Sequence, residues 1–399
     1  MNLSSGISYL AIPGPSVMPE RVLMAMHRSA PNIYEGELVA MVPELVDRLK
    51  RVARTKHDVA IYIANGHGAW EAAVSNALSA GDHVLALATG SFAHGWAEVA
   101  QRMGVETEVL DFGQRSAVDP ERLSERLRKD QDHEIKAVLA VHTDTSTGIR
   151  NDIEAIRSAI DMTGHPALFM VDCIASLGCD RFEMDAWGVD VMVAGSQKGL
   201  MTPPGLGFVY FNEKADAARN DAGLVSYYWD WRARVAPEVF YQYFGGTAPA
   251  HHLYGLREAL LMIEEEGLDG IWARHAAIAE AVWAAFDHWG KEGPLQVNAP
   301  DPSIRSHSVT ALLTGSAKAT ALREWCESRA GLTLGIGLGM AERTTPEWHH
   351  FFRLGHMGHV NAQMILGALG TVEAGLKAVG LPHRPGGALK ASELFAARA

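Results

Sequence analysis

Six short apolar segments between residues 59 and 211 alternate with segments of helical character. The apolar segments are Val59–Ala64, Val84–Ala88, Ala137–Val141, Ala167–Val171, Val189–Ala194 and Gly207–Phe211. Each is apolar almost throughout rather than at every second residue, which is typical of strands covered on both faces in a parallel sheet. The helical segments between them include Ala69–Leu78, Phe92–Arg102, Asp119–Arg128 and Ile153–Met162. This alternation predicts an α/β protein with a large doubly wound, mainly parallel sheet.

The C-terminal part of the chain predicts a second, smaller domain. Two long helices, Ala250–Glu266 and Leu268–His288, follow the last strand of the large sheet and are separated at Gly267. The elements expected after them are Ser308–Leu313, Ala317–Arg329, Phe351–Leu354 and Asn361–Val379. We therefore expect a large α/β domain over residues 31–290, a small C-terminal α+β domain over residues 291–399, and an N-terminal segment, residues 1–30, that joins the small domain.

The composition argues against several classes of protein. A formal net charge of −12 over 399 residues disfavours nucleic acid or an anionic membrane as the main partner. No apolar run is long enough to span a bilayer, and Met1–Ser5 lacks the basic start and apolar run of a signal peptide. The three cysteines, Cys173, Cys179 and Cys326, form no CxxC pattern. We expect a cytoplasmic protein.

Asp172 and Lys198 each follow a predicted strand of the large sheet. Asp172 comes directly after Ala167–Val171, and Lys198 comes a few residues after Val189–Ala194. Because strand C-termini of a doubly wound sheet point into the ligand crevice, both side chains are expected at one site. A lysine can hold pyridoxal phosphate as a Schiff base, and a carboxylate can keep its pyridine nitrogen protonated. Taken singly, Asp172 is more typical of a turn and Lys198 of the surface.

The sequence Asn65-Gly66-His67-Gly68 opens the helix that follows the first predicted strand. Backbone N–H groups at such a helix N-terminus can bind a phosphate, and the glycines allow a close approach. The GK[ST] ending of a P-loop is missing. An ordinary strand-to-helix turn is about equally typical of this pattern, so the phosphate interpretation depends on Asp172 and Lys198 lying at the same edge of the sheet.

Two further segments lie after predicted strands. The hydroxyl-rich loop His142–Gly148 contains Asp144 and Thr145, which could reach a cofactor or substrate, although such a loop is equally typical of a helix cap. Phe92 lies just beyond the strand Val84–Ala88 and could stack on a flat ring, although a core position is the more general expectation for an aromatic side chain.

Arg353 lies within the apolar segment Phe351–Leu354. An arginine inside an apolar strand usually has a fixed anionic partner. Its planar guanidinium suits the carboxylate of a substrate, and a structural salt bridge is the alternative.

Metal and serine-hydrolase chemistry are not expected. His251-His252 and His349-His350 are adjacent pairs and lack the HExxH spacing of a zinc helix, so no metal site is predicted. Ser176 and Ser196 have no GxSxG context.

Taken together, these segments resemble the class V (fold type I) pyridoxal-phosphate aminotransferases, most closely the alanine–glyoxylate, serine–glyoxylate and serine–pyruvate group. The similarity extends over nearly the whole chain. The motifs that carry it are Ile12-Pro13-Gly14-Pro15-Ser16, Asn65–Ala72, Thr145–Gly148, Val171-Asp172, Gly195–Lys198, Pro203-Pro204-Gly205 and Arg353–Gly358. The Ser196-Gln197-Lys198 and Arg353–Gly358 segments are the most specific.

The resemblance implies a role for each candidate residue. It implies that Lys198 forms a Schiff base with the cofactor and that Asp172 pairs with the pyridine nitrogen. Three residues, Gly66, His67 and Gln197, would hold the phosphate. Phe92 would stack on the ring, Thr145 would contact the cofactor, and Arg353 would bind the substrate carboxylate. The resemblance also implies a homodimer with shared active sites, in which Thr247 of the segment Phe244–Thr247 reaches the phosphate of the neighbouring subunit.

Three positions depart from this family pattern. Phe244 stands where a phosphate-binding tyrosine is common; the alternatives are that Tyr241 or Tyr243 replaces it or that this contact is lost. Asn65 replaces the usual serine or threonine before Gly66. The segment Tyr227–Arg232 is unusually aromatic, and if it lines the pocket the amino donor need not be plain serine or alanine.

The function expected from these residues and from the resemblance is amino transfer. Serine, alanine or aspartate would donate the amino group, and glyoxylate or pyruvate would accept it. Lys198 would move a proton between the substrate α-carbon and the cofactor. The alternatives are a pyridoxal-phosphate lyase of the aldolase or β-lyase type, and a non-catalytic cofactor-binding protein. A cysteine desulfurase is disfavoured because no cysteine lies where a mobile catalytic one is expected.

Overall fold

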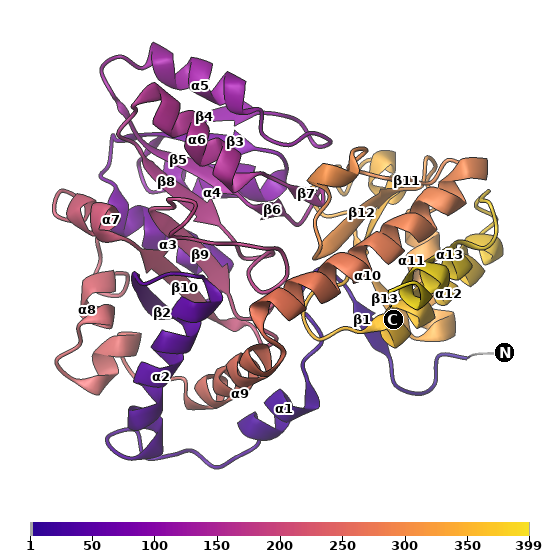
Figure 1. The fold of residues 1–399 in the computed structure, drawn as a ribbon, viewed down its shortest axis with the longest axis horizontal. Coiled ribbons are helices and arrows are strands. Elements are labelled where there is room, and N and C mark those ends of the chain that lie inside the picture. Colours follow the sequence, from indigo (N-terminus) through magenta and orange to yellow (C-terminus); the bar gives the residue numbers. More distant parts are fainter. Residues whose placement is uncertain (1–2, 399) are drawn as a thin grey trace.

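The computed structural model describes residues 3–398, and its largest feature is a seven-stranded sheet (Figure 1). In spatial order the strands are β2 (Asp58–Ala64), β10 (Gly205–Phe211), β9 (Val191–Gly195), β8 (Leu168–Asp172), β5 (Ile135–Val141), β3 (His83–Ala88) and β4 (Glu106–Asp111). All six strands predicted from the apolar segments are present in this sheet. The seventh, β4, was not predicted because its polar residues give no buried-strand pattern.

Six strands of the large sheet run in one direction, and β10 runs against both of its neighbours. The sequence predicted a mainly parallel sheet, which is confirmed, and within residues 3–398 β10 is its one antiparallel strand. The connection from Gly195 to Gly205 is too short for a parallel crossover, which needs a dozen or more residues. The sheet is therefore mixed but mainly parallel.

Successive residues of these strands enter two different cores. In β2, Val59 and Ile61 pack into the core beneath the helices α2 (Glu37–Val52), α5 (Pro120–Lys129), α6 (Ile153–Thr163) and α9 (Ala250–Glu266). Ala60 and Tyr62 pack on the opposite face, against α3 (Gly66–Ala77) and α4 (Ser91–Arg102). Because both faces are covered by helices, both sets of side chains must be apolar, which explains the nearly continuous apolar segments.

A second sheet of five strands forms the other end of the molecule (Figure 1). Its order is β1 (Tyr9–Ala11), β13 (Leu332–Ile336), β14 (Phe351–Gly355), β12 (Val309–Leu313) and β11 (Gln296–Val297). The N-terminal strand β1 pairs in parallel with β13, so the start of the chain lies in this second sheet. Helices α10 (Leu268–Trp289), α11 (Ala319–Ala330), α12 (Ala362–Ala378) and α13 (Gly387–Ala396) supply side chains to its core.

The remaining elements are short. They are α1 (Glu20–Met26), α7 (Glu213–Ala218), α8 (Trp231–Val235), the 3₁₀ turns η1 (Phe240–Phe244), η2 (Gly290–Glu292), η3 (Pro302–Ile304) and η4 (Pro346–His350), and the two-stranded ribbon β6 (Thr143–Asp144) and β7 (Ile149–Arg150). Within residues 3–398, none of the helices combines the length and apolar character needed to cross a membrane.

Candidate active site

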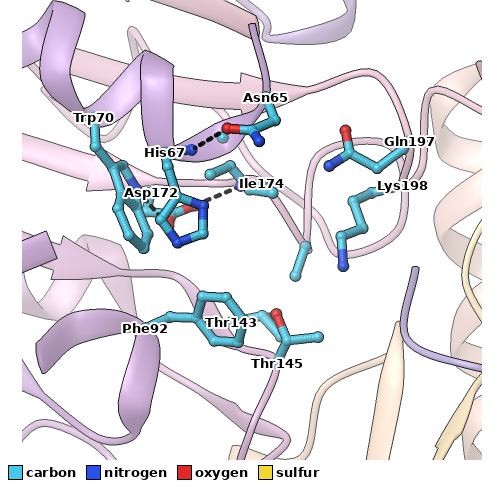
Figure 2. A pocket seen from close by; sticks show the side chains of 12 residues that line it. Asn65, His67, Trp70, Phe92, Thr143, Thr145, Asp172, Ile174, Gln197 and Lys198 are labelled. Atoms are coloured by element: carbon cyan, nitrogen blue, oxygen red, sulfur yellow. Dashed lines mark hydrogen bonds between the residues drawn. The ribbon is translucent and has the colours of Figure 1, made fainter. Parts of the chain in front are cut away.

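A cavity of about 230 Å³ lies at the carboxyl edge of the large sheet (Figure 2). It is lined by Asn65, Gly66, His67, Trp70, Phe92, Thr143, Thr145, Asp172, Ile174, Ala175, Gln197 and Lys198. These residues come from the ends of β2, β5, β8 and β9 and from the N-terminal turns of α3 and α4. The edge where parallel strands end is the usual ligand site of an open α/β sheet.

Asp172 is the last residue of β8 and is almost fully buried. Its Oδ1 accepts a hydrogen bond from the backbone N–H of Ile174 at 2.6 Å, and its Oδ2 accepts one from the indole Nε1 of Trp70 at 2.9 Å. Burial raises the pKa of Asp172 to about 7 because the charged form loses its hydration, and the two donors oppose this shift. A carboxylate oxygen can accept two hydrogen bonds, so each retains capacity for a ligand.

Lys198 lies in the turn after β9, and its side chain extends into the cavity (Figure 2). The N-terminal segment packs against it: Nζ donates to the carbonyl of Pro13, and the Ser16 hydroxyl donates to the Lys198 carbonyl at 2.7 Å. Gly14 has φ +103°, and a side chain there would overlap the Lys198 side chain. Burial and, to a lesser extent, the charge of Arg353 lower the pKa of Lys198 to about 8, against the opposing charge of Asp172. A substantial fraction of a nucleophilic free amine therefore exists near neutral pH.

Asn65 caps the helix that faces Lys198 across the cavity. Its side-chain oxygen accepts hydrogen bonds from the backbone N–H groups of His67 at 3.1 Å and Gly68 at 3.3 Å. A Cβ atom at Gly66 would overlap the end of the Ile174 side chain, which would have to move. Opposite, the buried Gln197 Oε1 has no hydrogen-bond partner within the described chain. This end of the cavity therefore holds a helix N-terminus, which can bind an anion, and the side-chain amide of Gln197, whose NH2 can donate a hydrogen bond to it.

Asp144, considered above as a possible cofactor or substrate contact, caps α4 instead. Its buried carboxylate accepts from the backbone N–H groups of Phe92 at 3.0 Å, Ala93 at 3.3 Å and Ser146 at 3.0 Å. The cap fixes the first turn of α4, which carries the Phe92 ring, while the neighbouring Thr145 presents its side chain to the same cavity (Figure 2).

Arg353, in β14 of the second sheet, borders the cavity without lining it. It is buried, and two backbone carbonyls hold its guanidinium: Nε donates to Ile336 and Nη1 donates to Thr145, each at 2.7 Å. Burial lowers its pKa to about 10, so the side chain stays charged at neutral pH. Nη2 makes no hydrogen bond within residues 3–398, which leaves this N–H group for a ligand.

The structure brings together seven of the nine predicted site residues. They are Gly66, His67, Phe92, Thr145, Asp172, Gln197 and Lys198. Arg353 lies beside them, and Thr247 is exposed and does not line this cavity. The aromatic segment Tyr227–Arg232 is also absent from the lining: Tyr228 donates to the Ile63 carbonyl, and Trp231 stacks on Phe211.

Sequence reasoning missed Trp70, Ile174 and Ala175 as lining residues, whereas Thr143 belongs to the hydroxyl-rich loop that was expected near the site. Trp70 follows His67 by one helical turn, so the 3.6-residue period could have placed both on one face of α3. Ile174 and Ala175 directly follow Asp172 in the turn after β8 and share its place at the sheet edge. Thr143 begins the ribbon β6, which no apolar pattern indicated.

Cysteine and metal chemistry find little support in this geometry. Cys173, Cys179 and Cys326 are buried, and burial raises the pKa of each thiol. Among residues 3–398, no three His, Cys, Asp or Glu side chains are grouped so that they could hold a metal ion.

A buried carboxylate, a lysine with a lowered pKa and a helix N-terminus at one sheet edge are the groups that a pyridoxal-phosphate site requires. The sequence profile described as Aminotransferase class-V matches residues 9–355. The chain is 37% identical to the serine–glyoxylate aminotransferase of Methylorubrum extorquens, over 98% of this chain and 96% of that one. It is 35% identical to the L-aspartate–glyoxylate aminotransferase of Paracoccus denitrificans, over 96% and 94% of the two chains. The crystal structure of pyridoxamine–pyruvate aminotransferase from Mesorhizobium loti superposes with a TM-score of 0.88 at 26% identity and covers 100% of both chains.

The chain belongs to the class V aminotransferase family and is a pyridoxal-phosphate-dependent transaminase of fold type I. The residues present fit that cofactor. Asp172 has acceptor capacity for a protonated ring nitrogen, and Lys198 carries the amine for a carbonyl carbon. The N-terminus of α3 and the side-chain NH2 of Gln197 can both donate hydrogen bonds to a phosphate.

Proposed function

We propose that this transaminase moves an amino group from a small amino acid (serine, alanine or aspartate) to a small 2-oxo acid (glyoxylate or pyruvate). The observation that carries the proposal is the placement of Lys198 and Asp172 in one buried cavity, with the pKa of Lys198 lowered to about 8. The substrate class is supported by the names of relatives that align over nearly the whole chain.

The chemistry divides between the cofactor and this chain. Pyridoxal phosphate, when bound, supplies a protonated ring that withdraws electrons from the substrate α-carbon. Asp172 keeps the ring nitrogen protonated by presenting a carboxylate to it. Lys198 would hold the cofactor as a Schiff base. Its Nζ, once free, would take the proton from the substrate α-carbon. Asp172 and Lys198 are both buried, which strengthens these charge interactions.

Gln197, Gly66 and His67 are assigned to the phosphate, Phe92 to one face of the ring, and Thr145 to a polar edge of the cofactor. The backbone N–H groups of His67 and Gly68 already donate hydrogen bonds to the Asn65 side chain. Phosphate binding would therefore use the Gly66 N–H and the Gln197 amide, or displace the Asn65 cap.

Arg353 is proposed to bind the substrate carboxylate through Nη2, since Nε and Nη1 already hold backbone carbonyls. Arg353→Ala is expected to raise KM for both donor and acceptor. The variant loses a buried charge-assisted contact, which is worth about 2–5 kcal/mol of binding free energy. Steady-state kinetics with both substrates measure this effect. The control is Arg305→Ala, which removes a buried arginine paired with Asp287. An unchanged KM in Arg353→Ala would make Arg353 purely structural.

We also propose a homodimer in which Thr247 reaches the phosphate site of the partner. Thr247 is exposed, and the preceding segment carries the exposed side chains Tyr227, Val239 and Tyr241, as expected of a surface that a second chain covers. Thr247→Ala is expected to raise the Kd for pyridoxal phosphate several-fold without changing the molar mass of the dimer. Cofactor titration and light scattering test this. A monomer at working concentration would refute the shared site.

Product analysis tests the reaction itself. The cofactor-loaded protein is incubated with L-serine, L-alanine or L-aspartate, with and without glyoxylate or pyruvate, and glycine, alanine and keto acids are quantified. Formation of the new amino acid in step with loss of the donor supports amino transfer. Cleavage or β-elimination products that form without an acceptor would instead show a lyase.

A further inference from the structure

One indole group contacts the key carboxylate of the site. Trp70 Nε1 donates to Asp172 Oδ2 at 2.9 Å, and the only other hydrogen bond to this carboxylate within residues 3–398 comes from the Ile174 backbone to Oδ1. The two donors come from different elements, α3 and the turn after β8, and each holds one oxygen (Figure 2). Together they fix the plane of the carboxylate while leaving acceptor capacity on both oxygens.

The indole of Trp70 is itself held in place. Its side chain is almost fully buried, and its ring stacks on Trp96 with centroids 6.1 Å apart and an interplanar angle of 13°. The centroid of the His67 ring lies 4.6 Å from that of Trp70 in a tilted arrangement, and the centroid of the Phe92 ring lies 6.4 Å away in an edge-to-face arrangement. Rotation of the indole away from Asp172 would disturb all three neighbours, so the N–H direction is set by packing.

Trp96 provides a natural comparison within the same core. It is also a fully buried tryptophan, but its Nε1 has no hydrogen-bond partner within the described residues. A buried N–H group without a partner is a cost to stability. The two stacked indoles therefore differ in one respect that matters for the site: only the N–H of Trp70 reaches Asp172.

We propose that Trp70 is a positioning residue, whose indole N–H orients the Asp172 carboxylate toward the ring nitrogen of pyridoxal phosphate and keeps it ionised. The inference rests on the proposed roles of Asp172 and the cofactor.

The electrostatic surroundings of Asp172 agree with this role. Burial, the largest influence, favours the protonated carboxyl group, and the nearby charge of Asp144 acts in the same direction. The Ile174 N–H, the Trp70 N–H and the charge of Lys198 favour the carboxylate. Removing the Trp70 donor shifts this balance toward a neutral carboxyl group, which pairs less well with a protonated ring nitrogen.

The test compares Trp70→Phe with Trp96→Phe. Both variants replace a buried indole by a phenyl ring, and only the first removes a hydrogen bond from Asp172. Trp70→Phe is expected to raise the Kd for pyridoxal phosphate about 10- to 100-fold, the typical effect of losing a hydrogen bond to a charged group. Trp96→Phe is expected to stay within about threefold of the wild type, because a phenyl ring still packs against Trp70 and the hydrogen bond from Trp70 to Asp172 remains.

A cofactor analogue without the ring nitrogen, 1-deazapyridoxal phosphate, separates positioning from general support of the cavity. If Trp70 acts through Asp172 on the ring nitrogen, the wild type and Trp70→Phe bind this analogue equally well. An equal loss of affinity for both ligands would overturn the proposal, because Trp70 would then only shape the cavity. An unchanged Kd for pyridoxal phosphate in Trp70→Phe would overturn it as well.

A second variant covers the case in which Trp70→Phe does not fold. Benzothienylalanine at position 70 keeps the size and shape of the indole and replaces only its N–H by sulfur. Its Kd values for pyridoxal phosphate and for the deaza analogue are expected to match those of Trp70→Phe, and the same two results would overturn the proposal. The wild-type titration separates this inference from the proposed function: if the wild type binds no pyridoxal phosphate, both fall, and if it binds and turns over while the variants match it, only the inference falls.

Discussion

Lys198→Ala is expected to reduce kcat for amino transfer by at least about 10³-fold. The variant loses the covalent link to the cofactor and the base that removes the α-proton, and positioned acid–base catalysis alone contributes about 10²–10⁴-fold. Single-turnover assays of the variant loaded with pyridoxal phosphate measure the effect.

The matched control for this variant is Lys214→Ala. Lys214 donates to the Ala167 carbonyl and pairs with Asp190, near the opposite edge of the sheet. Its loss is expected to leave kcat unchanged. If Lys198→Ala transaminates as fast as Lys214→Ala, the catalytic assignment of Lys198 is wrong.

Asp172→Asn is expected to lower kcat by roughly 10²–10⁴-fold, the equivalent of breaking a buried charge pair at about 3–5 kcal/mol. The amide has nearly the shape of the carboxylate but carries no charge, so it does not keep the ring nitrogen protonated. The Kd for pyridoxal phosphate should rise in parallel.

Asn76→Ala is a control for that change. Asn76 is a buried polar residue of the same helix as Trp70, and it bonds the Trp229 carbonyl rather than the cavity. Cofactor titration and stopped-flow kinetics should show a normal Kd and kcat for Asn76→Ala. A normal kcat in Asp172→Asn would show that a group other than Asp172 keeps the ring nitrogen of the cofactor protonated.

The apolar pattern predicted the strands of the large sheet because a sheet covered on both faces leaves a continuous apolar signal. It gave no strand at Glu106–Asp111, because β4 forms the edge of the sheet and most of its residues are partly exposed. The direction of β10 follows from the short connection between Gly195 and Gly205. The apolar pattern of a strand contains no information about its direction.

Site residues were predictable where they follow strands, since a parallel sheet brings all strand C-termini to one edge. Asp172, Lys198, Gly66 and Phe92 share the cavity for this reason. The hydrogen bond from Trp70 to Asp172 depends on how α3 packs against β8, which a linear pattern does not encode. The assignment of Thr247 depends on a second chain and stays a prediction.

The most direct test of the central claim is the absorbance spectrum of the purified protein loaded with pyridoxal phosphate, recorded before and after L-serine, L-alanine and L-aspartate are added separately. The account predicts a yellow protein whose colour fades with at least one of these amino acids and returns when glyoxylate or pyruvate is added. A protein that takes up no pyridoxal phosphate and stays colourless would contradict the account.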